Sequence, residues 1–343
     1  MLVLGIESTC DETACAVVRD GKEILSNVIR SQTDVHLPFG GVFPELACRR
    51  HIDALIPVVK SALLEAAISP SDIDLIAVAK GPGLIGALLI GLNAAKALSY
   101  AWNIPFIGVN HVEAHLYAAM MPHEQPPFPA LGLVVSGGHT FLVKILALGH
   151  YELIGTTQDD AIGEAFDKVA TLLGLPYPGG PEIEALAKRG DPGRFAFRAG
   201  KIKNHPWDFS FSGLKTHVLY TIKGPNATKN SPLLISEKEK ADIAASFQET
   251  ALRDVVGRSI EASKTFDALA IYCGGGVSNN ARFRALFDEL NCPIPVYLPQ
   301  KRLTLDNAAM IAGLGYHAFM KDNKGDMLDL EPMTRMPIGL PFP

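Results

Sequence analysis

The chain has 343 residues, more than the roughly 100–200 that one ordinary core supports, so two domains are expected. With 48% hydrophobic and 20% charged residues, its composition excludes a disordered chain. Thirty-one basic residues against 36 acidic ones leave a net charge of −5, which excludes a globally basic nucleic-acid binder but not a local basic patch.

The distribution of cysteine and apolar residues predicts a cytoplasmic protein with no membrane partner. Five cysteines are scattered without a Cys-x-x-Cys pair, which argues against a disulfide framework and against a structural zinc site. Glu7 interrupts the first apolar run, so we expect no signal peptide. The longest stretch without a charged residue or a histidine, Gly81 to Ala95, is shorter than the roughly 20 residues that a membrane span needs.

The chain opens with strands that are repeated later. Apolar runs separated by polar turns predict three strands at its start: Leu2–Ile6, Ala14–Val18 and one that ends near Val28. The same order returns at Leu131–Val135, Phe141–Leu146 and Tyr151–Ile154. Thr13 then corresponds to Thr140, and Gly21 to Gly149, at offsets of 127 and 128 residues. This similarity predicts an internal duplication, in which each copy opens one lobe.

Helices and strands are expected to alternate after each opening. Apolar spacing predicts helices at His51–Ala67, Ile85–Trp102, Ala161–Leu173, Glu182–Arg189, Lys238–Lys264 and Asn279–Leu290. Further strands are expected at Ile73–Ala79, Phe106–Val109 and Ala268–Cys273. We therefore expect an α/β fold with lobes at residues 1–120 and 130–325, and a C-terminal tail that packs back on the first lobe. A ligand cleft between the lobes would lie at strand carboxyl ends and helix N-termini.

Three segments place glycines and small hydroxyl residues directly after a predicted strand: Ser8–Thr13, Ser136–Thr140 and residues 274–280. Backbone N–H groups in such turns can point at an anion. Taken singly, each segment is better explained as an ordinary tight turn. Three of them in a duplicated chain predict a phosphate-bearing nucleotide. Neither the P-loop pattern nor the dinucleotide pattern is present.

Two histidines four residues apart, His111 and His115, share one face of a predicted helix. That spacing offers two imidazoles to a transition metal, although surface imidazoles explain an isolated pair equally well. Asp306 is the candidate third ligand, with a helix N-cap as the alternative role. Glu113 lies on a different face from His111, so the metalloprotease motif His-Glu-x-x-His is absent.

A cluster of basic residues is the best candidate for contact with nucleic-acid phosphates: Lys188, Arg189, Arg194, Arg198, Lys201 and Lys203. Only Asp191 opposes these charges. Phe195, Phe197 and Trp207 lie among and beside them, where aromatic rings could stack on bases. A solvated charged loop explains the cluster equally well.

A series of motifs along essentially the whole chain resembles the TsaD family of bacterial tRNA adenosine threonylcarbamoyltransferases. The motifs are Gly5–Thr13, Phe39–Val42, Pro44–Ala47, Gly81–Leu84, His111-x-x-x-His115, Ser136–Thr140, Tyr177–Pro181, Phe211–Thr216, Gly275–Ser278 and Asp306–Met310. The resemblance implies the duplicated two-lobe fold of the actin, Hsp70 and sugar-kinase superfamily (the ASKHA fold), with a nucleotide and metal site in the cleft. This agrees with the duplication inferred from the strands.

The resemblance also implies an acyltransferase. It would move threonylcarbamoyl from threonylcarbamoyl-AMP to N6 of the adenosine 3′-adjacent to the anticodon in tRNAs reading ANN codons, with release of AMP (t6A formation). One divalent metal ion per subunit, Fe²⁺ or alternatively Zn²⁺, would be held by His111, His115 and Asp306. The implied partners are tRNA, an inactive TsaB-like paralogue and a small TsaE-like P-loop ATPase.

By the same resemblance, site residues can be assigned along the chain. The substrate-binding turn comprises Val134, Val135, Ser136, Gly137 and Gly138, with His139 beside the phosphates. Asp167, Gly180, Glu184 and Asn280 would hold the nucleoside, Glu184 by accepting hydrogen bonds from ribose hydroxyls. Without the family, Asp167 would be interpreted as an exposed carboxylate paired with Lys168. Asp11 and Glu12 match acidic residues needed for activity, and Asp11 is the candidate acceptor of the amine proton.

Two other hypotheses are open at this point. A catalytically silent paralogue that acts as an assembly partner should lack the metal triad, which this sequence contains. A metalloprotease is disfavoured because no glutamate lies where a water-activating base is needed.

Overall fold

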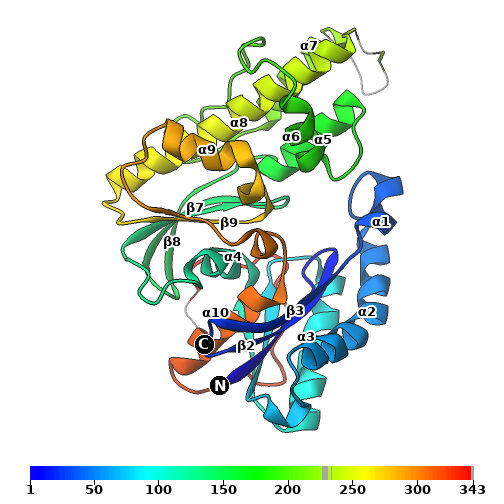
Figure 1. Ribbon diagram of the computed structural model, residues 1–343, viewed down its shortest axis with the longest axis vertical. Coiled ribbons are helices and arrows are strands. Elements are labelled where there is room, and N and C mark those ends of the chain that lie inside the picture. The colour runs from blue at the N-terminus through cyan, green and yellow to red at the C-terminus, as the bar shows by residue number, and fades with distance from the viewer. Residues whose placement is uncertain (226–230, 233, 341–343) are drawn as a thin grey trace. The chain divides into compact units, whose positions relative to one another are not determined.

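The structure is a computed structural model that describes residues 1–225, 231–232 and 234–340, and it contains two compact units (Figure 1). Unit 1 comprises Met1–Pro126, Leu146–Glu152 and the C-terminal segment from Pro299 onward. Unit 2 comprises Pro127–Ile145 and Leu153–Leu298. Unit 2 thus ends before residue 325, where the sequence placed the end of the second lobe, because helix α10 (Ala308–Met320) packs on the sheet of unit 1.

Unit 1 is built on a five-stranded sheet of order β3-β2-β1-β4-β5. Its strands are β1 (Leu2–Glu7), β2 (Glu12–Arg19), β3 (Glu23–Ser31), β4 (Leu75–Gly81) and β5 (Phe106–Asn110). The hairpins β1–β2 and β2–β3 are antiparallel, whereas β4 runs parallel to both β1 and β5. Side chains alternate between the two faces of such a sheet, so each face receives its own layer of helices.

The two faces of this sheet carry different helices. Leu4 and Ile6 share a buried core with residues of α2 (Pro44–Glu65) and α3 (Ile85–Trp102), which also contact each other. Gly5 points to the opposite face, where a Cβ atom would lie 2.2 Å from the carbonyl oxygen of Ala308 in α10. A glycine therefore allows α10 to approach β1 closely. Helix α4 (His111–Met120) follows β5 and packs against α10, and the short α1 (Thr33–His36) precedes α2.

Unit 2 repeats this plan with the strand order β10-β9-β6-β7-β8. The strands are β6 (Ala130–Val135), β7 (Thr140–Ala147), β8 (His150–Thr156), β9 (Ile271–Gly274) and β10 (Val296–Tyr297). The helices are α5 (Ile162–Leu173), α6 (Gly179–Ala187), α7 (Ser212–Lys223), α8 (Glu237–Thr265) and α9 (Ala281–Glu289). Apolar residues of β6 and β7 form one core with α5, α7, α8 and α9.

The two sheets match strand for strand, β1 with β6 through β5 with β10, and in each the first hairpin is antiparallel. The internal duplication predicted from the turn motifs is confirmed. Among the described residues, α3 is the helix long and apolar enough to cross a membrane, with a mean hydropathy of 1.2. In this fold it packs against α2 and β4.

Candidate active site

Helix α4 presents the two histidines from the end of β5. The side chain of Asn110 accepts hydrogen bonds from the backbone N–H groups of Val112 and Glu113, so this residue is the N-cap and His111 begins the helix. The four-residue spacing brings the two imidazole rings to a centroid distance of 4.7 Å. His111 is 5% exposed and His115 is 1% exposed, so the alternative of surface imidazoles is wrong.

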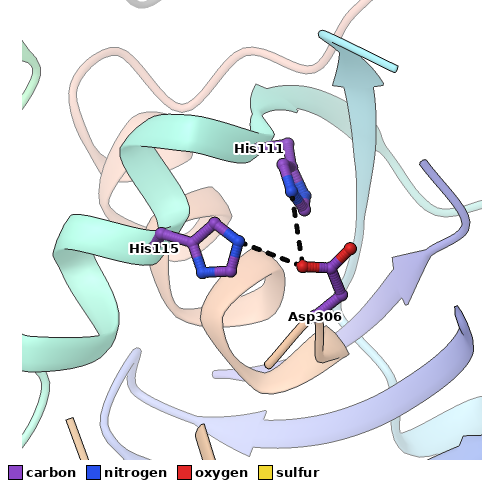
Figure 2. A group of neighbouring side chains, drawn as sticks. All are labelled: His111, His115 and Asp306. Carbon is purple, nitrogen blue, oxygen red and sulfur yellow. Dashed lines mark hydrogen bonds and ion pairs between the residues drawn. The ribbon is translucent and has the colours of Figure 1, made fainter. Parts of the chain in front are cut away.

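Asp306 approaches both histidines from just before α10, as Figure 2 shows. Its Oδ1 lies 3.1 Å from Nε2 of His115 and 3.6 Å from Nε2 of His111. One ligand atom from each of the three residues lies within 4.8 Å of the others. The N-cap of α10 is Asn307, whose side chain accepts from the N–H of Met310. The alternative role of Asp306 as N-cap is therefore wrong.

Glu7, at the end of β1, is a site residue that sequence reasoning missed. Its Oε2 lies 2.8 Å from Nδ1 of His111, and its side chain is fully buried. A carboxylate only accepts, so Nδ1–H of His111 donates to Glu7 and Nε2 is left to bind a metal. Burial lowers the pKa of His111, but Glu7 and Asp306 outweigh it and raise this pKa to about 9. The sequence offered one signal for Glu7, namely a charged residue at the end of a predicted buried strand.

The cluster has the chemistry of a metal site. Two imidazole nitrogens and one carboxylate oxygen form a donor set used for Fe²⁺ and for Zn²⁺. Nδ1 of His115 is buried and has no hydrogen-bond partner among the described residues. The chain thus offers three ligands in one place, with the tautomer of one of them fixed by Glu7.

The acidic turn after β1 carries Asp11 and Glu12 in the same unit. Oε1 of Glu12 accepts a hydrogen bond from the Ser31 hydroxyl, whereas its Oε2 is buried without a partner in the described part of the chain. Burial raises the pKa of Asp11, and it raises the pKa of Glu12 to about 7. Both carboxyls are therefore more basic than free ones.

His51 of α2 holds this acidic turn in place. Its Nε2 lies 3.0 Å from the carbonyl oxygen of Cys10, and its Nδ1 lies 2.8 Å from the hydroxyl of Thr13. A carbonyl only accepts, so Nε2–H donates to Cys10 and Nδ1 accepts from Thr13. The buried imidazole thus joins the residues on either side of Asp11 and Glu12.

The predicted substrate turn joins β6 to β7 in unit 2. The N–H of Ser136 donates to the carbonyl of His139, and the N–H of His139 donates to the Ser136 hydroxyl. Gly137 and Gly138 are exposed, and a Cβ atom on either would meet no described atom within 4 Å. Val134 and Val135 are fully buried, so they can offer a ligand only their backbone.

Two further elements reach this turn. The N–H groups of Ile162 and Gly163, in the first turn of α5, donate to the Thr140 hydroxyl and the Ser136 carbonyl. The positive end of the helix dipole therefore lies beside the exposed glycines. Gly275 approaches so closely that a Cβ atom would lie 2.5 Å from the Val135 carbonyl. The structure thus brings two of the three predicted turns together, while the third lies in unit 1.

The four residues predicted to hold a nucleoside also lie in unit 2. Oδ1 of Asp167 accepts from the N–H of Gly179, whereas Lys168 pairs with Asp160 and Glu164. The alternative of an Asp167–Lys168 pair is therefore wrong. A Cβ atom on Gly180 would meet no described atom within 4 Å, so the space beside this residue is open.

Glu184 lines a cavity of about 240 Å³ together with Ala187, Lys188, Pro192, Ala245, Gln248, Glu249, Ala281 and Arg282. Its Oε1 accepts from the N–H of Ala281. Asn280 caps α9 with its side-chain oxygen and donates through Nδ2 to Oε1 of Gln248. Sequence reasoning missed Gln248, because nothing in the pattern of α8 marks it apart from other helix residues.

The four basic residues proposed for tRNA contact, Arg194, Arg198, Lys201 and Lys203, are all exposed on an irregular segment between α6 and α7. The neighbouring aromatic rings are not. Phe197 is 8% exposed, and both Phe195 and Trp207 pack against the core of unit 2. These rings therefore contribute to the core of unit 2, whereas the four charges are exposed, and stacking of the rings on bases stays a prediction.

Comparison with known proteins decides the family. Residues 23–313 match the model of the TsaD family, described as tRNA N6-adenosine threonylcarbamoyltransferase. A protein of that name from Protochlamydia amoebophila (strain UWE25) is 62% identical over 339 residues, which cover 98% of each chain. Another, from Chlamydia trachomatis serovar A, is 51% identical over 320 residues, or 93% of each chain. The chain belongs to the TsaD family.

Membership of this family makes the protein an acyltransferase that modifies tRNA at N6 of an adenosine. The fold agrees. ROK hexokinase from Thermus thermophilus, 18% identical, has a TM-score of 0.51 over 94% of this chain and 99% of its own. The fold is therefore that of the actin, Hsp70 and sugar-kinase superfamily. As a TsaD member with a complete His–His–Asp cluster, the chain does not fit the hypothesis of a silent paralogue.

Proposed function

We propose that this chain transfers a threonylcarbamoyl group from threonylcarbamoyl-AMP to N6 of the adenosine 3′-adjacent to the anticodon, in tRNAs that read ANN codons. AMP is the second product. The observation that carries the proposal is the convergence of His111, His115 and Asp306 in a chain of the TsaD family.

The reaction needs no covalent enzyme intermediate. The exocyclic amine of adenine is a weak nucleophile, because its lone pair is delocalised into the ring. The donor compensates, since its mixed anhydride with phosphate has AMP as a good leaving group. A bond forms between N6 and the carbamoyl carbon, the bond from that carbon to the phosphate oxygen breaks, and N6 loses a proton. Positioning and charge stabilisation supply the catalysis.

Asp11 accepts the proton from N6 in this proposal, and Glu12 assists it. Burial raises the pKa of both carboxyls, which makes each a better base than a free carboxylate. The bonds of His51 to Cys10 and Thr13 keep the acidic turn in one conformation, which limits the reorganisation needed at the reaction step.

His111, His115 and Asp306 would hold a divalent ion, Fe²⁺ or alternatively Zn²⁺, which supplies Lewis-acid polarisation of a carbonyl or phosphoryl oxygen. The donor set fits either ion. Glu7 orients His111 through Nδ1 and thereby leaves Nε2 for the ion.

Unit 2 binds the adenylate part of the donor in this proposal. The exposed glycines of the turn contact its phosphate, and the positive end of the α5 dipole, which lies beside them, stabilises the negative charge. Its nucleoside occupies the region of Asp167, Gly180 and Asn280, and extends to the cavity lined by Glu184. That the two units share one cleft stays a prediction.

The proposed surroundings follow from the family resemblance. The protein works in the cytoplasm with tRNA, a TsaB-like inactive paralogue and a TsaE-like P-loop ATPase. The exposed charges of Arg194, Arg198, Lys201 and Lys203 contact tRNA phosphates.

Reconstitution with synthetic threonylcarbamoyl-AMP and unmodified tRNA tests the function directly. Mass spectrometry of the digested tRNA should show threonylcarbamoyladenosine at the position after the anticodon. One arm contains the chain alone, and a second adds the two partner proteins. Absence of product in both arms, with the donor intact, would contradict the proposed reaction. Product in the second arm alone would show that turnover needs the partners.

A further inference from the structure

The C-terminal segment of the chain packs along the end of unit 1 where α4 carries the candidate ligands His111 and His115. The N–H of Met333 donates to the carbonyl of Lys80 at the end of β4, and the N–H of Gly83 donates to the carbonyl of Thr334. Farther along, the segment reaches α4. We refer to residues 333–339 as the C-terminal strap.

Two bonds join the strap to the first turn of α4. Nδ2 of Asn110 donates to the carbonyl of Pro337 at 3.1 Å, while Oδ1 of the same side chain caps the helix. Oε1 of Glu113 accepts from the N–H of Gly339 at 3.0 Å. The strap therefore contacts the residues on either side of His111, one before it in the chain and one after.

Glu113 is a buried carboxyl that the proposed reaction does not use. Its side chain is 1% exposed, and it is not one of the three candidate metal ligands. A buried carboxyl is costly unless it is hydrogen-bonded, and the strap supplies a backbone donor for it.

Gly339 allows the strap to lie where it does. Its φ of +84° belongs to the left-handed region, and a Cβ atom would lie 2.2 Å from the carbonyl oxygen of Tyr151. Tyr151 lies in the first part of β8, within the segment Leu146–Glu152 that belongs to unit 1 together with the strap and α4. A side chain at residue 339 therefore forces the strap or the Tyr151 backbone to shift, and it strains the bond from Gly339 to Glu113 without altering any residue of α4.

We propose that the C-terminal strap positions the first turn of α4, and with it His111 and His115, for metal binding. Glu113 is a positioning residue that transmits this constraint. Groups that orient metal ligands from outside the coordination sphere commonly change metal affinity about 10- to 100-fold when removed. The inference rests on the metal centre of the proposed function. It assigns a role in that centre to the strap, which is distant in sequence from both candidate ligands on α4.

The first test compares two full-length variants that carry the same backbone penalty. Gly339→Ala strains the bond from the strap to Glu113. Gly174→Ala has an equally unfavourable φ of +75°, but a Cβ there meets no described atom within 4 Å. We measure Zn²⁺ affinity by competition with a chromophoric chelator, and ligand geometry from the visible absorption of bound Co²⁺. Gly339→Ala should bind Zn²⁺ about tenfold more weakly than wild type, with an altered Co²⁺ spectrum, while Gly174→Ala matches wild type.

The second test uses Glu113 itself. Glu113→Gln keeps a side-chain oxygen that accepts from Gly339, so Zn²⁺ affinity should stay close to wild type. Glu113→Leu removes the acceptor and should weaken binding as much as Gly339→Ala does. Since both act through one bond, the double variant Glu113→Leu/Gly339→Ala should be no weaker than the single ones.

The outcomes separate the strap from the metal centre. Wild-type affinity for Zn²⁺ in folded Gly339→Ala, verified by its thermal melting curve, would overturn the role of the strap and leave the metal centre intact. Equal losses in Gly339→Ala and Gly174→Ala would also overturn it, because general destabilisation would then suffice. A wild-type chain that binds neither Zn²⁺ nor Fe²⁺ would overturn both the strap proposal and the metal centre.

Discussion

The first hairpin turn of unit 1 and that of unit 2 occupy the same place in the duplicated fold but carry opposite chemistry. The turn between β1 and β2 is acidic, with Asp11 and Glu12 after the buried Glu7. The turn between β6 and β7 has no acidic residue and exposes the backbone of Gly137 and Gly138. Phosphate is repelled by carboxylates and attracted by free N–H groups, so the second turn, and not the first, suits the phosphate of the proposed donor.

This difference shows that the two copies of the duplicated fold carry different functional groups at equivalent positions. In the proposed function, unit 1 contains the residues assigned to metal binding and proton transfer, and unit 2 contains those assigned to nucleotide binding. Changes in unit 1 should therefore affect metal content and reaction rate. Changes in unit 2 should affect donor and tRNA binding while leaving the metal in place.

The largest effect is expected for Asp306→Ala, which removes one of the three candidate metal ligands from unit 1. Bound metal should fall to less than about a tenth of wild type, and the transfer rate about 10³-fold. Metal analysis and single-turnover assays measure both. His205→Ala removes an exposed imidazole from unit 2 and should change neither. Full metal content in Asp306→Ala would show that the cluster is not the metal site.

A smaller loss of rate is expected for Asp11→Asn, because an amide cannot accept the N6 proton. The single-turnover rate should fall about 100-fold, with donor affinity, tRNA affinity and metal content unchanged. Wild-type single-turnover rates would contradict the assigned role. If Glu12→Gln instead shows the larger loss, the proton acceptor is the neighbouring carboxylate.

Metal binding to unit 1 should depend on pH. The raised pKa of His111, about 9, means that this imidazole carries a proton near neutral pH when metal is absent. Binding must release that proton, so metal affinity should rise about tenfold per pH unit and level off above pH about 9. Titration with Zn²⁺ at several pH values, in buffers of different ionisation enthalpy, counts the released proton. An affinity independent of pH between 6 and 8 would mean that His111 is already neutral.

Gly137→Ala provides the converse test in unit 2. The added methyl group meets no described atom of the protein, so folding should be unaffected. It would occupy space beside the proposed phosphate position, and should weaken donor binding about fivefold, or ~1 kcal/mol. Calorimetry with a stable analogue of the donor measures this affinity. Gly213→Ala, equally open but outside the site, is the matched control. A loss of bound metal in Gly137→Ala would contradict the proposal that metal binding depends on unit 1 and not on unit 2.

The smallest effect is expected on the basic segment of unit 2. Reversing the charges of Arg194 and Arg198 should weaken tRNA binding by several fold, and should lower the slope of log affinity against log salt by about two. Lys60→Glu reverses an exposed charge on α2 and serves as the control. An unchanged salt slope would place the tRNA contact elsewhere.

Local patterns were enough to predict most of the secondary structure. Periodicity located α3, α5 and α8, because these helices have an apolar face that a 3.6-residue repeat reveals. Periodicity missed α7. Leu214, Val218 and Ile222 form its buried stripe, but Gly213 in its first turn is a weak helix former and does not mark a helix start. Helix α2 begins at Pro44, earlier than the predicted His51, because its first turn is mostly exposed and lacks an apolar repeat.

The sequence by itself determined the duplicated α/β plan, the pair of histidines on one helical face and the family, because each depends on residues that are close in the chain or on motifs in a fixed order. Only the tertiary structure decided that Glu7 orients His111 and that the chain end binds Glu113. Those contacts join residues 104 and more than 200 positions apart. They depend on how buried polar groups find partners once the sheet has formed, and no local pattern encodes that pairing.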